Sequence, residues 1–171
     1  MSNILVMSDT HGNTAAIQGL LSIYQNQVDA VIHLGDNAQD MQRFVSTDKN
    51  SDTFYMVNGN MDSESDDIKE RVVEIAGKRI FITHGHHYNV KSKLDNIIYK
   101  AQELQVNACL FGHTHNPIMF KQEGILFLNP GSLTYPCPGT ERSYGLIFIS
   151  EDKGINGALF SYKEAATCQE K

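Results

Sequence analysis

Five short apolar runs in this sequence each end in a group of Asp, His, Asn and Gly residues. These groups occupy positions 9–12, 35–37, 59–62, 84–87 and 112–115. Six of the seven histidines lie in or beside them, and none follows His115. Carboxylates and imidazoles without a nearby thiolate are ligands that suit manganese, iron, zinc, nickel or cobalt. The pattern therefore predicts a metal site assembled from distant segments.

The number of candidate ligands indicates two ions rather than one. One catalytic ion takes about three protein ligands and keeps one position open. Paired ions about 3.5–4 Å apart clamp the attacking and leaving oxygens of a phosphoryl displacement, and they lower the pKa of a water between them. With one carboxylate bridging, two ions would suit the seven candidates Asp9, His11, Asp36, Asn60, His84, His113 and His115.

These polar groups can meet only if the strands before them are neighbours. Apolar runs at 4–7, 30–34 and 54–57 alternate with helical patterns over 13–26 and 38–46. This order predicts a parallel sheet with right-handed crossovers. In such a sheet the carboxyl ends of neighbouring strands converge on one crevice, which would bring the groups together.

The second half of the chain is richer in antiparallel signals. Turn residues separate the apolar runs of two hairpins, and a helical pattern with a buried face follows the first hairpin. We predict hairpins at 72–83 and 119–128, a helix over 91–105, and strands at 108–111, 146–149 and 158–162.

Length and composition indicate an ordinary globular chain. The 171 residues predict a single domain over 1–163 and a polar tail at 164–171. No apolar run approaches the roughly 20 residues of a membrane span, and no signal peptide is evident. The net charge of −6 argues against a grip on duplex nucleic acid. Three cysteines without a CxxC pair, Cys109, Cys137 and Cys168, predict a reducing, cytoplasmic setting.

The ordered motifs resemble those of the calcineurin-like metallophosphoesterase superfamily. They are Asp9-x-His11, Gly35-Asp36, Gly59-Asn60, His84 and Gly112-His113-Thr114-His115. Asn129-Pro130-Gly131-Ser132 is similar to a motif of its small bacterial and archaeal phosphodiesterase group. The resemblance covers about residues 3–160. It implies an α/β fold, an αββα sandwich of two packed mixed sheets flanked by helices.

The resemblance also implies a role for each candidate ligand. Asp36 would bridge the two ions, a metal-bound hydroxide would be the nucleophile, and Asn60 would also hold the substrate phosphate. The first ion would take Asp9, His11, Asp36 and His115, and the second Asp36, Asn60, His84 and His113.

One position departs from the superfamily pattern. Met61 stands where the superfamily usually has a histidine that assists the leaving group, although the small phosphodiesterase group often lacks it too. A missing general acid costs about 10²–10⁴-fold, so we predict slow turnover of alkyl esters and a preference for activated diesters. His86 is the candidate replacement, with His87 second, and Ser132 is a candidate substrate contact through its hydroxyl or its backbone N–H. His33, inside a strand, is interpreted as a core residue or a partner of a ligand.

Three functions are compatible with these residues. The first is a dinuclear phosphodiesterase acting on a small-molecule diester, with manganese the expected ion. The second is a non-catalytic metal-binding scaffold, as in a retromer subunit of the superfamily that has lost part of the ligand set. The third is a phosphomonoesterase or nucleotide pyrophosphatase. The full ligand set favours an enzyme, and the absence of a motif arginine favours diesters. Edge strands would also allow a homo-oligomer.

Overall fold

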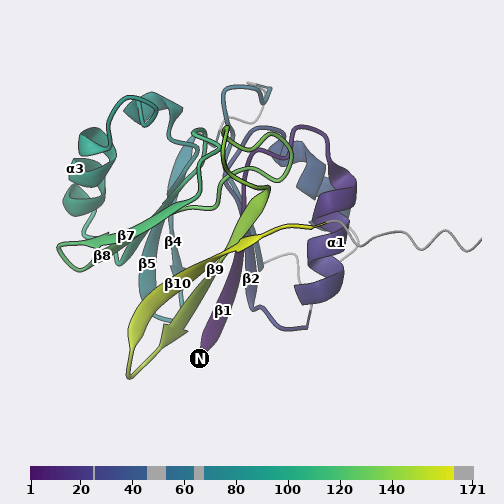
Figure 1. Cartoon of the computed structure of the whole chain (residues 1–171). Helices are drawn as coiled ribbons and strands as arrows, with labels where there is room; N and C mark the ends of the chain where they lie inside the picture. Colours follow the sequence, from purple (N-terminus) through teal and green to yellow (C-terminus); the bar gives the residue numbers. More distant parts are fainter. Residues whose placement is uncertain (25, 46–52, 64–67, 164–171) are drawn as a thin grey trace, which may run out of the picture.

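Two five-stranded sheets pack against each other, with helices on their outer faces (Figure 1). This computed structural model describes residues 1–24, 26–45, 53–63 and 68–163. The arrangement confirms the predicted αββα sandwich of two mixed sheets. The polar tail predicted at 164–171 lies outside the described residues.

The first sheet has the strand order β10-β9-β1-β2-β3. Its strands β1 and β2 are parallel, as are β2 and β3, and this confirms the predicted parallel unit. β9 pairs antiparallel with both β1 and β10. The strands span Ser2–Met7 (β1), Ala30–His33 (β2), Phe54–Met56 (β3), Ser143–Ser150 (β9) and Gly154–Ser161 (β10).

The second sheet has the strand order β4-β5-β6-β8-β7. The two predicted hairpins form its edges, as antiparallel pairs β4–β5 and β7–β8. Its centre is parallel, because β5 pairs with β6 and β6 with β8. The strands span Glu70–Ile75 (β4), Lys78–Thr83 (β5), Ala108–Phe111 (β6), Ile118–Gln122 (β7) and Ile125–Asn129 (β8).

Helix α1 covers the outer face of the first sheet and α3 that of the second (Figure 1). α1 spans Thr14–Tyr24, and Asn13 caps it by accepting a hydrogen bond from the backbone N–H of Ala16 at 3.1 Å. Between β2 and β3 lie the 3₁₀ turn η1, Ala38–Met41, and the short α2, Gln42–Val45. None of the described helices is long and apolar enough to cross a membrane.

The helix predicted from residue 91 begins later. α3 spans Asp95–Glu103 and follows the 3₁₀ turn η4, His86–Tyr88. The backbone N–H groups of Ser92 and Lys93 both bond back to the carbonyl of Asn89. Asn89 itself has a left-handed φ of 55°. Residues 91–94, which the apolar periodicity assigned to the helix, therefore belong to the turn that precedes it.

The main core lies between the two sheets and fixes how their strand ends meet. Alternate residues of β1 divide between two clusters: Ile4 and Val6 pack in the core between the sheets, whereas Leu5 and Met7 pack with α1. Leu110 of β6 lies in the core between the sheets and is fully buried. With both faces covered, the sheets hold the carboxyl ends of their parallel strands, and the loops that follow them, at one end of the molecule (Figure 1).

Truncation of this core is expected to destabilise the fold. Leu110→Ala should lower the free energy of unfolding by about 2–5 kcal/mol, because a buried cavity adds to the lost transfer free energy. Denaturant unfolding would measure the change, with Ile23→Ala on the exposed side of α1 as control. Equal midpoints for the two variants would contradict the placement of Leu110 in the core.

Candidate metal centre

Six of the seven candidate ligands converge where the strands of both sheets end. Their donor atoms form two groups, and within each group the atoms lie within 4.8 Å of one another. Asp36 belongs to both. The first group is Asp9, His11, Asp36 and His115, and the second is Asp36, His84 and His113.

The two oxygens of Asp36 face different groups. Oδ2 lies 3.8 Å from Nε2 of His11, and Oδ1 lies 3.4 Å from Nε2 of His84. Nε2 of His84 is in turn 3.1 Å from Nδ1 of His113. A carboxylate placed in this way can contribute one oxygen to each of two cations.

Backbone carbonyls orient two of the imidazoles. Nδ1 of His84 lies 2.8 Å from the carbonyl oxygen of Leu34, and Nδ1 of His115 lies 2.5 Å from that of Tyr135. A carbonyl only accepts, so each Nδ1 carries a proton, and in the neutral form of each ring the lone pair of Nε2 faces the centre. Such partners fix the tautomer and the direction of a metal-binding histidine.

The environment of Asp9 tests whether these residues fit a cation. Oδ2 of Asp9 accepts hydrogen bonds from Oγ of Ser8 at 2.5 Å and from the backbone N–H of His113 at 3.2 Å. Oδ1 is buried, and in the described part of the chain no donor meets hydrogen-bond geometry with it, although Nε2 of His115 is 3.0 Å away. A buried carboxylate oxygen left in this state fits a bound cation.

The protonation states also suit a cation. Burial, with His84 nearby, lowers the pKa of His113 to about 4, so this imidazole is neutral at pH 7. Burial alone would raise the pKa of Asp9, but contact with His115 and hydrogen bonding from Ser8 lower it. The same contact raises the pKa of His115, so a cation bound there would have to displace a proton from Nε2. Neutral imidazoles and ionised carboxylates are the forms that bind metal ions.

Most of the candidate ligands sit on unusual backbone. The φ angles of Asp9, His11, Asp36, His113 and His115 are 54°, 45°, 57°, 69° and 57°. Non-glycine residues rarely adopt this left-handed region, and such strain concentrates at functional sites. Backbone hydrogen bonds between the loops hold these left-handed conformations in place. The N–H of Asp9 donates to the carbonyl of Gly35 and the N–H of Gly112 to the carbonyl of His84, each at 3.0 Å.

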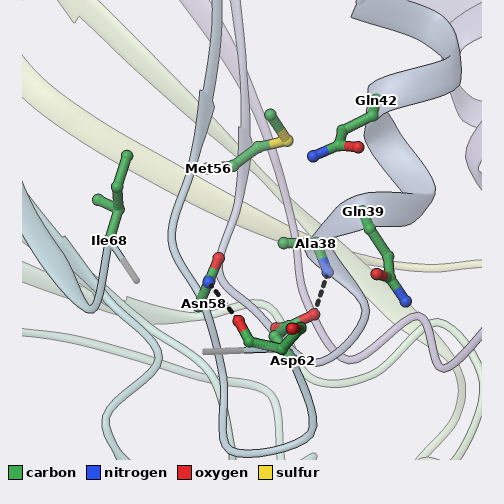
Figure 2. A pocket seen from close by; sticks show the side chains of 8 residues that line it. Ala38, Gln39, Gln42, Met56, Asn58, Asp62 and Ile68 are labelled. Atoms are coloured by element: carbon green, nitrogen blue, oxygen red, sulfur yellow. Dashed lines mark hydrogen bonds between the residues drawn. The ribbon is translucent and has the colours of Figure 1, made fainter. Parts of the chain in front are cut away.

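Asn60, the seventh candidate, is exposed on a loop that touches Asp36. The backbone N–H of Met61 donates to Oδ1 of Asp36 at 3.0 Å. A Cβ at Gly59 would overlap the same oxygen, so only glycine permits this approach. Asp62 accepts a hydrogen bond from the N–H of Gly59 at 2.7 Å. It also accepts one from the N–H of Ala38 at 2.9 Å, which ties this loop to the loop carrying Asp36 (Figure 2).

The hydroxyl of Ser132, expected to contact substrate, is instead fully buried. It donates to the carbonyl of Asp9 at 2.8 Å and accepts from the N–H groups of Thr134 at 3.1 Å and Tyr135 at 2.9 Å. All of its hydrogen-bonding capacity is used inside the protein. The hydroxyl of Ser132 therefore positions the loop that carries Asp9 and is not itself available to a ligand.

Asn129, from the same motif, supports the loop that carries two histidines. Its Nδ2 donates to the carbonyl of Gly112 at 2.8 Å and to Oγ1 of Thr114 at 3.0 Å. Its Oδ1 accepts from the backbone N–H of Gly131 at 2.9 Å. The motif thus forms a buried scaffold beneath the centre.

His33 links two ligand-bearing loops through partners that sequence reasoning missed. Its Nδ1 accepts from the N–H of Gly35 at 3.2 Å, so Nε2 carries the proton and donates to Oγ1 of Thr10 at 3.1 Å. Thr10 donates in turn to Asp40 at 2.9 Å. Burial lowers the pKa of His33 to about 4, consistent with this neutral form. No periodic or motif signal in the sequence pointed to Thr10 or Asp40.

The two remaining histidines differ in their distance from the centre. The ring centroid of His86 lies 5.3 Å from that of His84 and 6.0 Å from that of His113. His87 is exposed, and its ring centroid lies 3.9 Å from that of His86 with the two planes inclined by 40°. Burial, with His87 and His84 nearby, lowers the pKa of His86 to about 4.

A small pocket is lined in part by the loops that follow β2 and β3 (Figure 2). It has a volume of about 160 Å³ and shares Ala38 and Asp62 with the loops around Asp36. Side-chain amides of Gln39, Gln42 and Asn58 line it together with apolar side chains. None of the residues of the two metal-binding groups faces it.

Comparison with known proteins decides the family. The family model described as the calcineurin-like phosphoesterase superfamily domain matches residues 2–152. The chain belongs to this superfamily. Over 150 residues it is 30% identical to the probable metallophosphoesterase YsnB of Bacillus subtilis, covering 88% of this chain and 86% of YsnB. It is also 30% identical over 148 residues to the phosphodiesterase MJ0936 of Methanocaldococcus jannaschii, covering 74% and 81% of the two chains.

Solved structures of this superfamily share the fold. A predicted phosphoesterase from Streptococcus pneumoniae superposes with a TM-score of 0.73 at 30% identity, covering 94% of this chain and 98% of that one. The comparisons confirm the family that the motifs predicted. The protein is a metal-dependent phosphoesterase, and the Asp and His side chains described above are its candidate metal-binding residues.

Ser132→Ala separates a supporting role from substrate contact. Loss of the hydroxyl leaves buried backbone groups without partners, so we expect the free energy of unfolding to fall by about 1–3 kcal/mol. KM of the metal-loaded variant should stay unchanged. Ser22→Ala on the exposed side of α1 is the matched control. A raised KM at unaltered stability would show that Ser132 binds substrate after all.

Proposed function

We propose that this phosphoesterase is a phosphodiesterase with two divalent ions that share Asp36. The observation that carries the proposal is the direction of the Asp36 carboxylate, whose oxygens face His11 on one side and His84 on the other. A single-ion site would have no use for the second group of donors. The fit of Asp9 and of the oriented imidazoles to cations supports the same conclusion.

Each candidate ligand has a role in this proposal. Asp9, His11 and His115 complete the first site, while Asn60, His84 and His113 complete the second. When bound, two ions supply Lewis acidity and lower the pKa of water between them. The protein holds the donors in place through carbonyls of Leu34 and Tyr135 and through buried hydrogen bonds.

The absence of arginine from the motif loops favours a diester substrate over a monoester. None of the four arginines lies in the loops 9–12, 35–37, 59–62, 84–87 and 112–115. These loops therefore offer no planar bidentate clamp for a monoester dianion. MJ0936, to which the chain is similar, is named a phosphodiesterase.

Asn60 and His86 are the proposed substrate contacts. Asn60 is exposed beside the loop contact to Asp36, and its amide can donate to a phosphate oxygen. With a pKa near 4, His86 is neutral at pH 7, so it can donate a hydrogen bond but is a poor proton donor. Met61 is 64% exposed, and its thioether side chain carries no polar hydrogen that it could donate to a leaving group.

The metal and the cellular setting are finer parts of the proposal. Manganese suits a donor set of carboxylates, imidazoles and one amide, and iron, zinc, nickel or cobalt would also fit. We place the protein in the cytoplasm because Cys109 and Cys137 are free thiols.

Hydrolysis of bis(p-nitrophenyl) phosphate by metal-stripped protein tests the reaction. We expect activity to return with manganese, at two ions per chain, and to exceed that on p-nitrophenyl phosphate. Asp36→Asn should lower kcat/KM by more than about 10³-fold, because it removes the shared negative charge that two dications need. Asp95→Asn, an exposed carboxylate at the start of α3, is the matched control.

Three results would redirect the proposal. A stoichiometry of one ion per chain in active protein would contradict the sharing of Asp36 between two ions. Faster cleavage of the monoester would favour a phosphomonoesterase. Folded protein that binds two ions and cleaves neither ester would favour the non-catalytic scaffold.

The dependence of kcat/KM on the leaving group tests whether the site lacks a proton donor. Between methyl p-nitrophenyl phosphate and methyl phenyl phosphate, we expect kcat/KM to fall by at least about 10²-fold, because the poorer leaving group departs without a proton. His86→Ala should reduce both rates by a similar factor, and His87→Ala should change neither. A loss confined to the phenyl ester in His86→Ala would instead identify His86 as the general acid.

A further inference from the structure

One large aromatic side chain stands exposed beside the first group of donors. Tyr135 is 62% exposed, and its ring centroid lies 5.3 Å from that of His11, with the two planes inclined by 49°. No hydrogen bond to its phenol oxygen is found among the described residues. Both the ring and the hydroxyl are therefore available to a ligand.

The backbone of Tyr135 is held firmly although its side chain is free. Its carbonyl accepts from Nδ1 of His115, and its N–H donates to the buried Oγ of Ser132. Two residues later, the N–H of Cys137 donates to the carbonyl of His115 at 3.0 Å. These contacts tie the position of the ring to a candidate metal ligand on one side and to the loop carrying Asp9 on the other.

A rigidly placed, exposed aromatic ring is a suitable binding surface. Tyrosine offers a large planar face at a low cost in side-chain entropy, and aromatic groups prefer offset or tilted contact with one another. Tyr135 presents this face next to His11 of the first group, one of the two groups between which the phosphate would bind in the proposed function. A planar substituent on that phosphate would lie within reach of the ring.

We infer that Tyr135 is a specificity-determining residue that stacks against an aromatic or heteroaromatic substituent of the diester. The inference rests on the proposed function and extends it, because it names the class of substrate: diesters with at least one planar ring attached through oxygen to phosphorus. Recognition here uses the face of the ring, so it requires the aromatic side chain and not the hydroxyl.

Two compounds of matched size separate ring stacking from simple bulk. Diphenyl phosphate carries planar rings, whereas dicyclohexyl phosphate carries saturated rings of similar volume. Their dissociation constants from the metal-loaded protein can be measured by calorimetry, and their inhibition constants in the bis(p-nitrophenyl) phosphate assay. Metal content is determined for every variant, because the Tyr135 ring also touches His11.

Wild-type protein is expected to bind diphenyl phosphate more tightly than dicyclohexyl phosphate. In Tyr135→Ala the ratio of the two dissociation constants should shift by roughly fivefold against diphenyl phosphate. Tyr135→Phe should retain the wild-type ratio, and Tyr99→Ala, which removes a 69% exposed tyrosine on α3, should leave it unchanged. All variants should keep two ions per chain.

Three outcomes would overturn the inference. The first is an unchanged preference in Tyr135→Ala, and the second is a loss in Tyr135→Phe as large as in Tyr135→Ala, which would assign the contact to the hydroxyl. The third is a loss of bound metal that accounts for the whole effect. Failure of the wild type to hydrolyse any diester would count against the proposed function instead, since the affinity ratio is measured without turnover.

Discussion

The carboxylate of Asp36 is the constraint around which the whole site is arranged. Its two oxygens face two separate groups of donors, so the orientation of one side chain sets the relation between those groups. The orientation is fixed by the N–H of Met61 and by the close approach that Gly59 allows. The other loops of the site must therefore place their donor atoms on one side or the other of this carboxylate.

The placement of these donors relies on buried or half-buried polar residues that are not themselves among the metal-binding groups. Asp62, Asn129, Ser132 and His33 each bond backbone groups of ligand-bearing loops. They compensate for left-handed backbone at most of the candidate ligands, since such conformations persist only when surrounding contacts over-determine them. The accuracy of the site is therefore a property of its supporting hydrogen bonds as much as of its donors.

The sequence was sufficient for the parallel unit β1-β2-β3 and for the convergence of polar groups, because strand ends in such sheets share one edge. It could not indicate the parallel pairing of β5, β6 and β8, since a short apolar run carries no direction. The inward direction of the Ser132 hydroxyl could not be predicted, because a loop hydroxyl has the same sequence signature whether it points inward or outward. Thr10 and Asp40 escaped notice because their contact joins residues 30 positions apart.

The candidate ligands come from both halves of the sandwich. Asp9, His11 and Asp36 follow strands of one sheet, while His84, His113 and His115 follow strands of the other. Any ligand that bridges them would bind the folded state alone, and its binding free energy would add to the cohesion between the sheets. Chelation should therefore loosen the sandwich as a whole, with thermal denaturation that depends on free-metal concentration and faster amide exchange in the strands beneath the site.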